Sequence, residues 1–182
     1  MKRILACLFS LVSLCASAQI TLNESGVYEK TVVEQFGETT AATLYSRALE
    51  GLSDFAGEGK SSIGVDYKDK ETATIIFKGR SYLGFKKVMG GAGWNVWSEL
   101  TLKIRCKDGR AQITVIVPSM YFEYNASAAR ASVPLAQFVP EVTYKGLYLK
   151  KAAQQYVVEI PADVDKLISA VKEKMNKEVD DF

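Results

Sequence analysis

The sequence contains no histidine among its 182 residues. This absence removes the commonest general base, the Ser–His and Cys–His nucleophile pairs, and the commonest zinc ligand. Cysteine, aspartate and glutamate do not gather at a spacing that a metal site uses. We therefore predict no catalytic constellation of these kinds, no metal site and no cofactor.

Long apolar runs are missing except at the N-terminus. There a basic pair, Lys2-Arg3, precedes an apolar run that ends in Ala16-Ser17-Ala18, a pattern typical of a cleaved secretory signal. The run is shorter than the roughly 20 apolar residues that a membrane span needs. We predict that residues 1–18 are a signal peptide and that the mature chain begins at Gln19. The protein is then exported to the periplasm or cell envelope, or secreted, with no transmembrane span.

Cysteine is scarce, and two of the three cysteines, Cys7 and Cys15, lie in the predicted signal. Cys106 then stands alone, so the mature chain has no pair for an intrachain disulfide. Lipidation of Cys15 is an alternative to cleavage after Ala18. A bacterial lipoprotein site has a small residue before the cysteine, however, and this chain has Leu14 there.

Neither sign of charge predominates. The chain has 23 Lys and Arg and 21 Asp and Glu, and removal of Lys2 and Arg3 with the signal leaves the mature chain neutral. A neutral chain with dispersed charges lacks the basic footprint of a nucleic-acid-binding protein, so we predict no nucleic-acid partner. Residues 19–182 have the size of one domain, which buries about 70% of its unfolded surface without disulfides.

The apolar periodicity predicts the order strand, helix, four strands, helix. Residues 26–36 are rich in strand-forming side chains, and Thr39 or Thr40 then starts a helix that ends at Gly57 or Gly59. Strands follow at 61–67 and 72–78, the second of which continues past Gly79 towards Phe85. A last helix opens at Pro161 and carries an apolar stripe of Val164, Leu167, Ile168, Val171 and Met175.

Asp108-Gly109 predicts a two-residue type I′ hairpin turn, because both central residues of that turn need positive φ. If Lys107 lies opposite Arg110, apolar pairs share one face: Cys106–Ala111, Ile104–Ile113, Leu102–Val115 and Leu100–Val117. The other face pairs Arg105 with Gln112 and Lys103 with Thr114. A slip of one residue would set apolar against polar side chains, so the register is specified. Cys106 is then a core residue and not a nucleophile.

Residues 125–160 are predicted to be an elaborated connection with short edge strands at 143–149 and 156–160. A sheet with one polar face and two amphipathic helices buries its apolar face under both helices. The predicted fold is α+β, a two-layer sandwich of an antiparallel sheet with two helices on one face. Its core is residues 26–124 plus a helix at 161–179. Whether residues 125–160 cover the other sheet face stays open.

Three short segments carry a resemblance to a known family: Thr43-Leu44-Tyr45-Ser46-Arg47-Ala48, Thr74-Ile75-Ile76-Phe77-Lys78-Gly79 and Lys107-Asp108-Gly109-Arg110. With the signal and the element order, they resemble uncharacterised envelope proteins of Bacteroidetes bacteria whose domain of unknown function has a TBP-like fold. The resemblance covers residues 26–124. It implies that fold and a periplasmic or secreted location. It implies no activity and no functional residue, and a TBP-like fold does not by itself imply DNA binding.

Two groups of aromatic residues are candidate binding sites. Trp94, Asn95 and Trp97 follow a glycine-rich segment at 90–93, and indole rings beside a flexible loop suit contact with a sugar or peptide. The alternative is that Trp97 packs at the sheet edge and the glycines only allow a wide hairpin. Tyr121 and Tyr124 belong to a second set that could line a groove, together with Phe122, Tyr144 and Tyr148. Packing at strand ends is the alternative for that set.

We favour a non-enzymatic binding or structural module of the envelope that contacts a protein, peptide or glycan. The alternative is a small carboxylate-based hydrolase, or a carrier of a lipid or small molecule. Two acidic pairs could suggest hydrolytic carboxylates. Asp163 with Asp165 is explained by the start of the last helix, where acids are favourable, and Asp180 with Asp181 by a solvated tail. A pocket with two carboxyl groups about 5–10 Å apart would favour the hydrolase. A closed apolar cavity would favour the carrier, and a shallow polar sheet face the binding module. The oligomeric state stays open.

Overall fold

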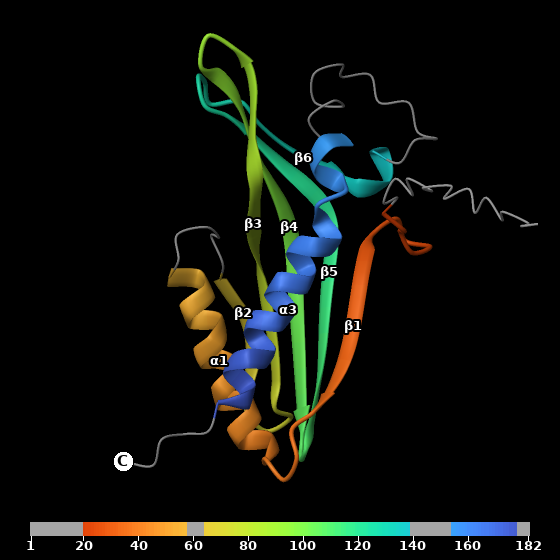
Figure 1. Ribbon diagram of the computed structural model, residues 1–182, viewed down its shortest axis with the longest axis vertical. Helices are drawn as coiled ribbons and strands as arrows, with labels where there is room; N and C mark the ends of the chain where they lie inside the picture. Colours follow the sequence, from red (N-terminus) through yellow and green to blue (C-terminus); the bar gives the residue numbers. More distant parts are fainter. Residues whose placement is uncertain (1–19, 58–63, 139–153, 178–182) are drawn as a thin grey trace, which may run out of the picture.

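The protein is built around one antiparallel sheet of six strands. The computed structural model describes residues 20–57, 64–138 and 154–177 (Figure 1). The strand order is β1-β5-β4-β3-β2, and β6 also pairs with β5. The strands are β1 (Tyr28–Gln35), β2 (Gly64–Asp69), β3 (Thr74–Met89), β4 (Ala92–Lys107), β5 (Arg110–Tyr124) and β6 (Arg130–Pro134). The helices are α1 (Ala41–Gly57) and α3 (Ile160–Asn176), with a 3₁₀ turn η1 at Leu135–Gln137.

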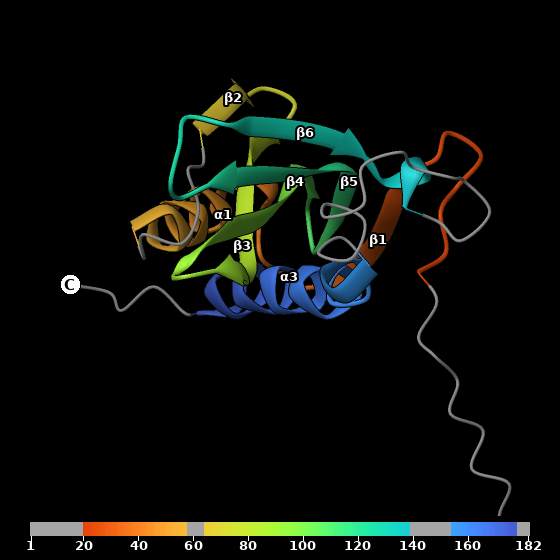
Figure 2. The ribbon, with the colours of Figure 1, turned by 90° about the horizontal axis from the view of Figure 1, so that it is seen from above.

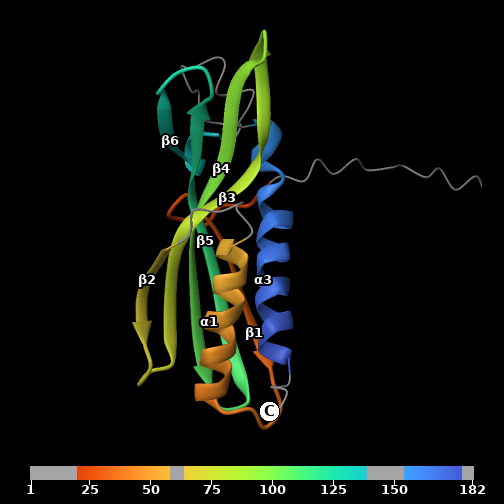
Figure 3. The ribbon, with the colours of Figure 1, turned by 90° about the vertical axis from the view of Figure 1, so that its left-hand side faces the viewer.

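Both long helices lie on the same face of the sheet, as the edge-on view shows (Figure 3). This confirms the predicted α+β sandwich with two helices on one face. Seen from above, α3 lies on one side of β4 and β5 while β6 lies on the other side of β5 (Figure 2). All five residues of the predicted α3 stripe are buried: Val164, Leu167, Ile168, Val171 and Met175. Burial of these apolar side chains against the sheet is the main stabilising term of the fold.

The first helix starts where one of the two predicted caps places it. The Thr40 hydroxyl accepts a hydrogen bond from the Thr43 backbone N–H at 3.2 Å, as an N-cap does. Leu44, Ala48 and Leu52 of its apolar face are almost fully buried. No helix within the described residues is long and apolar enough to cross a lipid bilayer.

The register of the β4–β5 hairpin agrees with the prediction except at its far end. Cys106, Ile104 and Leu102 pair with Ala111, Ile113 and Val115, and the polar face pairs as expected. The predicted Leu100–Val117 pair is wrong because the register shifts between Glu99 and Thr101, which pair with Ser119 and Ile116. Pro118 lies in the extra segment of β5, and proline cannot donate to the ladder, so a bulge is favoured there.

The glycine-rich segment is tighter than the sequence suggested. Only Gly90 and Gly91 form the turn, with φ of 56° and 90°, and Ala92 and Gly93 already belong to β4. At Gly93 a Cβ would lie 2.4 Å from the Lys86 carbonyl oxygen, so close strand packing explains this glycine. The β3–β4 hairpin is therefore one long ribbon whose far end extends beyond both helices (Figures 1 and 3).

The connection between β5 and α3 contains a strand that the sequence reading missed. Strand β6 pairs with residues 119–123 of β5, the part of that edge that β1 leaves free. The edge strand predicted at 156–160 is wrong, because residues 154–157 are helical and α3 begins at Ile160. Tyr156 packs onto the glycine at position 84, where a Cβ would lie 2.6 Å from its ring. The strand predicted at 143–149 lies outside the described residues.

Candidate functional site

The face of the sheet opposite the helices is the candidate site, and we call it the open face. Within the described residues, no helix packs against it (Figure 3). Alternation along regular strands sends every second side chain to this face. In β4 these are the residues at odd positions, from Asn95 to Lys107, and the even positions from Val96 to Cys106 are buried on the helix side. Apart from Trp97, these odd-numbered residues of β4 are polar.

Three aromatic side chains cross the upper half of the open face, and we call them the aromatic row: Tyr82, Trp97 and Tyr121. Trp97 pairs with Tyr82 on β3 and with Tyr121 on β5. The Tyr82 and Trp97 ring centroids are 4.8 Å apart with an edge-on angle of 62°. Tyr82 is 38% exposed, whereas Tyr121 is buried beneath the Arg80 guanidinium, whose carbon lies 3.4 Å from its ring centroid. Tyr82 is therefore the accessible end of the row.

A polar network holds this half of the face in place. Arg80 donates from Nε and Nη2 to Glu99 Oε1 at 3.1 and 3.0 Å. Ser119 donates to Glu99 Oε2 at 2.6 Å, and Ser132 of β6 donates to the same oxygen. Burial acts to raise the pKa of Glu99, but the hydrogen bonds from both serines and Arg80 together outweigh it and lower that pKa. Glu99 therefore ties β3, β5 and β6 together as a carboxylate.

The five predicted site residues do not form one site. Trp97 and Tyr121 meet on the open face, and Asn95 lies on the same face opposite Glu123. Trp94 instead pairs with Tyr124, with ring centroids 4.9 Å apart, and packs against the buried core on the helix side. Positions 94 and 97 are an odd number of residues apart, so a regular strand sends them to opposite faces. The segment that contains both tryptophans was expected to form a loop, but it belongs to β4.

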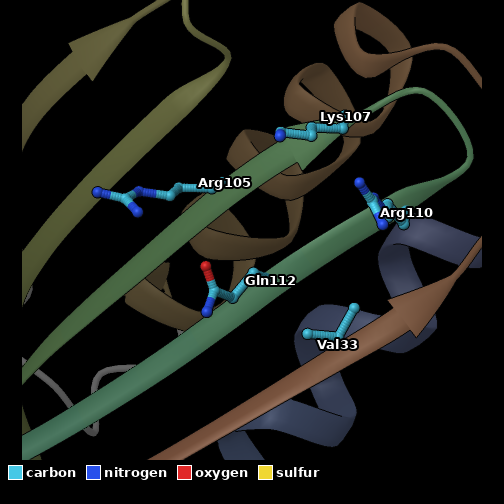
Figure 4. A pocket seen from close by; sticks show the side chains of 5 residues that line it. All are labelled: Val33, Arg105, Lys107, Arg110 and Gln112. Carbon is cyan, nitrogen blue, oxygen red and sulfur yellow. The ribbon is translucent and has the colours of Figure 1, made fainter.

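The lower half of the open face is basic. Lys103, Arg105 and Lys107 are alternate residues of β4, and Arg110 faces Lys107 across the turn. We call these four residues the basic patch. A hollow of about 290 Å³ lies between them and β1, lined by Val33, Arg105, Lys107, Arg110 and Gln112 (Figure 4). A second hollow of about 250 Å³ adjoins it and includes Lys103 and Glu29. The neutral composition concealed this local charge.

The basic patch has no acidic partner among the described residues. The ion pairs among the described residues are Lys30–Asp165, Lys78–Asp66, Arg80–Glu99, Arg130–Glu123 and Lys172–Glu34. Each of these uses cations outside the patch. Asp108 sits in the turn beside Lys107, but its carboxylate accepts a hydrogen bond from the Ala41 backbone N–H at 2.8 Å and so caps α1. The alternation of cations on β4 was visible in the sequence, and only the pairing of β4 with β5 adds Arg110.

The carboxylates do not form the pair that a hydrolase would need in these hollows. A third hollow, of about 380 Å³, lies beside Arg80. Among the described residues, Glu99 is the one acidic residue that lines it, and Glu29 is the one acidic residue that lines the hollow beside Lys103. Asp163 and Asp165 separate: Asp165 binds Lys30, while Asp163 faces the sheet interior and accepts hydrogen bonds from Ser81 at 3.0 Å and Ser98 at 3.5 Å. Burial raises the pKa of Asp163. Asp180 and Asp181 lie outside the described residues.

The thiol is placed as a core side chain. Cys106 is 4% exposed, and burial raises its pKa to about 11, so the thiolate needed for nucleophilic attack is not populated near neutral pH. In the described part of the chain, no three acidic or cysteine side chains gather closely enough to hold a metal ion. What the open face offers chemically is contact: aromatic surface at one end and positive charge at the other.

Known structures share the fold of this chain. A DUF4468 family protein from Bacteroides ovatus is 11% identical, with a TM-score of 0.57 over 92% of this chain and 95% of that one. A TBP-like protein from Parabacteroides distasonis is also 11% identical, with a TM-score of 0.58 over 84% of this chain and 97% of that one. No family model and no curated protein matches the sequence. The likeness to uncharacterised Bacteroidetes proteins with a TBP-like fold is confirmed at the level of the fold.

Proposed function

We propose that the protein is an exported, non-enzymatic binding module of the bacterial envelope, and that the open face of its sheet is the contact surface. In this proposal residues 1–18 are removed on export and the mature domain begins at Gln19. A protein, peptide or glycan then contacts the face that the helices leave free.

The observation that carries the proposal is the difference in side-chain composition between the two faces of the sheet. The helix side is filled by apolar side chains, while the open face carries the partly exposed ring of Tyr82 and four cations without acidic partners among the described residues. A sheet face that served only as a solvated surface would disperse its charges. A cluster of four cations without an ion-pair partner among the described residues is typical of a binding surface.

Site-specific cross-linking tests which face makes the contact. A photoreactive amino acid replaces Tyr82 on the open face in one variant and the exposed Ser169 on α3 in the matched control. Both variants are expressed in the native host and irradiated in intact cells. We expect a discrete higher-mass adduct from position 82 and none from position 169. Adducts from position 169 alone, or equal yields from both, would contradict the assignment.

The export arm of the proposal has its own measurement. We expect the mature protein to fractionate with the periplasm or envelope and its N-terminal peptide to begin at Gln19. A cytosolic protein that retains residues 1–18 would refute this arm. Lipidation at Cys15 would appear instead as a mature chain that begins at that cysteine with an added acyl mass.

A further inference from the structure

We propose that the basic patch binds an extended acidic peptide, in which carboxylates at alternate positions lie along β4. This inference rests on the proposed function and names the chemistry of its partner. The candidate residues are Lys103, Arg105 and Lys107 on β4 and Arg110 on β5. The apolar side chain of Val33, 56% exposed, forms the rim of the same hollow (Figure 4).

The positive charge of the basic patch is not compensated by any ion pair among the described residues. Lys107 and Arg110 are direct cross-strand neighbours, and like charges in that position destabilise a hairpin. The nearest acid in the turn, Asp108, is occupied by the N-terminus of α1. Glu34 of β1 is occupied by Lys172 on the helix side. Glu29 of β1 lines the second hollow together with Lys103, and its carboxylate accepts a hydrogen bond from Asn23 at 3.2 Å. None of the ion pairs among the described residues joins a carboxylate to the four cations, which favours an anionic partner from outside.

The spacing of the cations along β4 matches that of an extended peptide. Same-face residues of a strand repeat every two residues, or about 6.6–6.8 Å, so the three cations of β4 form a row with that period. An extended peptide has the same period for its own alternate side chains. Acidic side chains at every second position therefore stay in register with Lys103, Arg105 and Lys107 over the whole row. A polymer with another charge period matches one cation and then drifts out of register.

Hydroxyl, amide and apolar side chains surround the cations of the patch. Thr31 and Thr114, whose hydroxyls are hydrogen-bonded to each other at 2.9 Å, and Gln112 lie beside the cations. The exposed Val33 and the half-buried Ile116 add apolar contact. Hydroxyl, amide and apolar surface around a row of cations suits the mixed side chains of a peptide. The two adjoining hollows, of about 290 and 250 Å³, follow the row of cations and suit an extended segment that lies across both.

The test uses two synthetic peptides of the same composition and charge. One alternates threonine and glutamate, and the other groups the glutamates in adjacent pairs. Binding to the mature chain is followed by fluorescence anisotropy at low salt and at high salt. We expect the alternating peptide to bind more tightly than the paired one and to lose affinity as salt rises.

The Lys103→Gln, Arg105→Gln double variant is expected to bind the alternating peptide roughly 4- to 25-fold more weakly, since each exposed ion pair contributes a factor of about 2–5. The matched control, Lys166→Gln with Lys177→Gln, removes the same charge from exposed positions on or just beyond α3 and is expected to bind like the parent. A Lys103→Glu, Arg105→Glu variant separates loss of binding from misfolding. We expect this variant to bind an alternating threonine–lysine peptide in preference to the alternating threonine–glutamate peptide.

Equal affinity for the alternating and paired peptides would overturn the inference, and so would an unchanged affinity in the Lys103→Gln, Arg105→Gln variant. Tighter binding to polygalacturonate or to anionic phospholipid vesicles would identify a glycan or a membrane instead and would overturn the peptide assignment. If no anion binds while position 82 still forms adducts in cells, the inference fails and the proposed function stands. If neither occurs, both fail.

Discussion

Replacing Glu99 by glutamine tests whether the polar network is the structural support of the open face. Glu99 is the acceptor for Arg80, Ser119 and Ser132, so one substitution weakens links from β4 to three other strands. The Glu99 side chain is 23% exposed and that of Arg80 is 35% exposed, so the pair is partly shielded from solvent. Charge-assisted hydrogen bonds in such places contribute about 1.5–3 kcal/mol each, and glutamine keeps part of them.

We therefore expect Glu99→Gln to lower the free energy of unfolding by about 2 kcal/mol at pH 7, or Tm by roughly 4–8 °C. The pKa of Glu99 is lowered in the folded protein. Its contribution is therefore present above the unfolded pKa and is lost as pH falls through the folded value. Thermal unfolding followed by circular dichroism between pH 3 and pH 7 measures the difference between parent and variant, which should shrink in acid.

The matched control is Glu123→Gln, which removes an ion pair to the exposed Arg130 on the same face. An exposed pair contributes about 0–1 kcal/mol, so this variant should unfold within a few degrees of the parent. The reasoning is refuted if Glu99→Gln is no less stable than Glu123→Gln at pH 7. It is also refuted if the loss at Glu99 stays constant from pH 7 to pH 3.

Three further predictions concern other parts of the fold. Burial raises the pKa of Asp163, so the folded protein binds the carboxyl proton more tightly than the unfolded chain does. Protonated Asp163 therefore stabilises the fold below the unfolded pKa, and this contribution is lost as pH rises through the folded pKa. The Tm of Asp163→Asn minus the Tm of the parent should therefore increase when pH is raised from 3 to 7. Cys106 should not react with a thiol reagent in the native protein and should react fully in denaturant. Gly109→Ala, at φ +71° with a Cβ 2.6 Å from the Gly37 carbonyl oxygen, should lose more stability than Gly90→Ala, at φ +56° in open space, where about 1 kcal/mol is expected.

Local rules were sufficient for much of the fold. The Asp108-Gly109 turn and strict alternation specified the register of β4 against β5, and the apolar stripe specified the buried face of α3. The prediction of Leu100 opposite Val117 failed because a bulge interrupts the ladder beside Pro118, and a proline, which favours such a bulge, was visible in the sequence. The interpretation of the glycine run as a loop was wrong at its third glycine, because Gly93 is needed for close strand packing and not for a turn.

The site was harder to predict, because it depends on which strands are neighbours. Trp94 and Trp97 are close in sequence yet lie on opposite faces once the segment is a strand. Trp97 meets Tyr121 only because β4 pairs with β5, and Glu99 reaches Ser132 only because β6 adds to the same edge. The predicted hairpin already placed Lys103 and Arg105 on the polar face, but the net charge of zero did not show that these cations lack ion-pair partners among the described residues.

Lysine footprinting in the native envelope tests the open face as the contact surface most directly, because it needs no variant. An amine-reactive label is applied to intact envelope and to the purified mature chain, and each lysine is quantified by mass spectrometry. We predict that Lys103 and Lys107 are protected in the envelope and reactive after purification, while Lys166 and Lys177 react equally in both. Equal reactivity of all four lysines, or protection confined to Lys166 and Lys177, would contradict it.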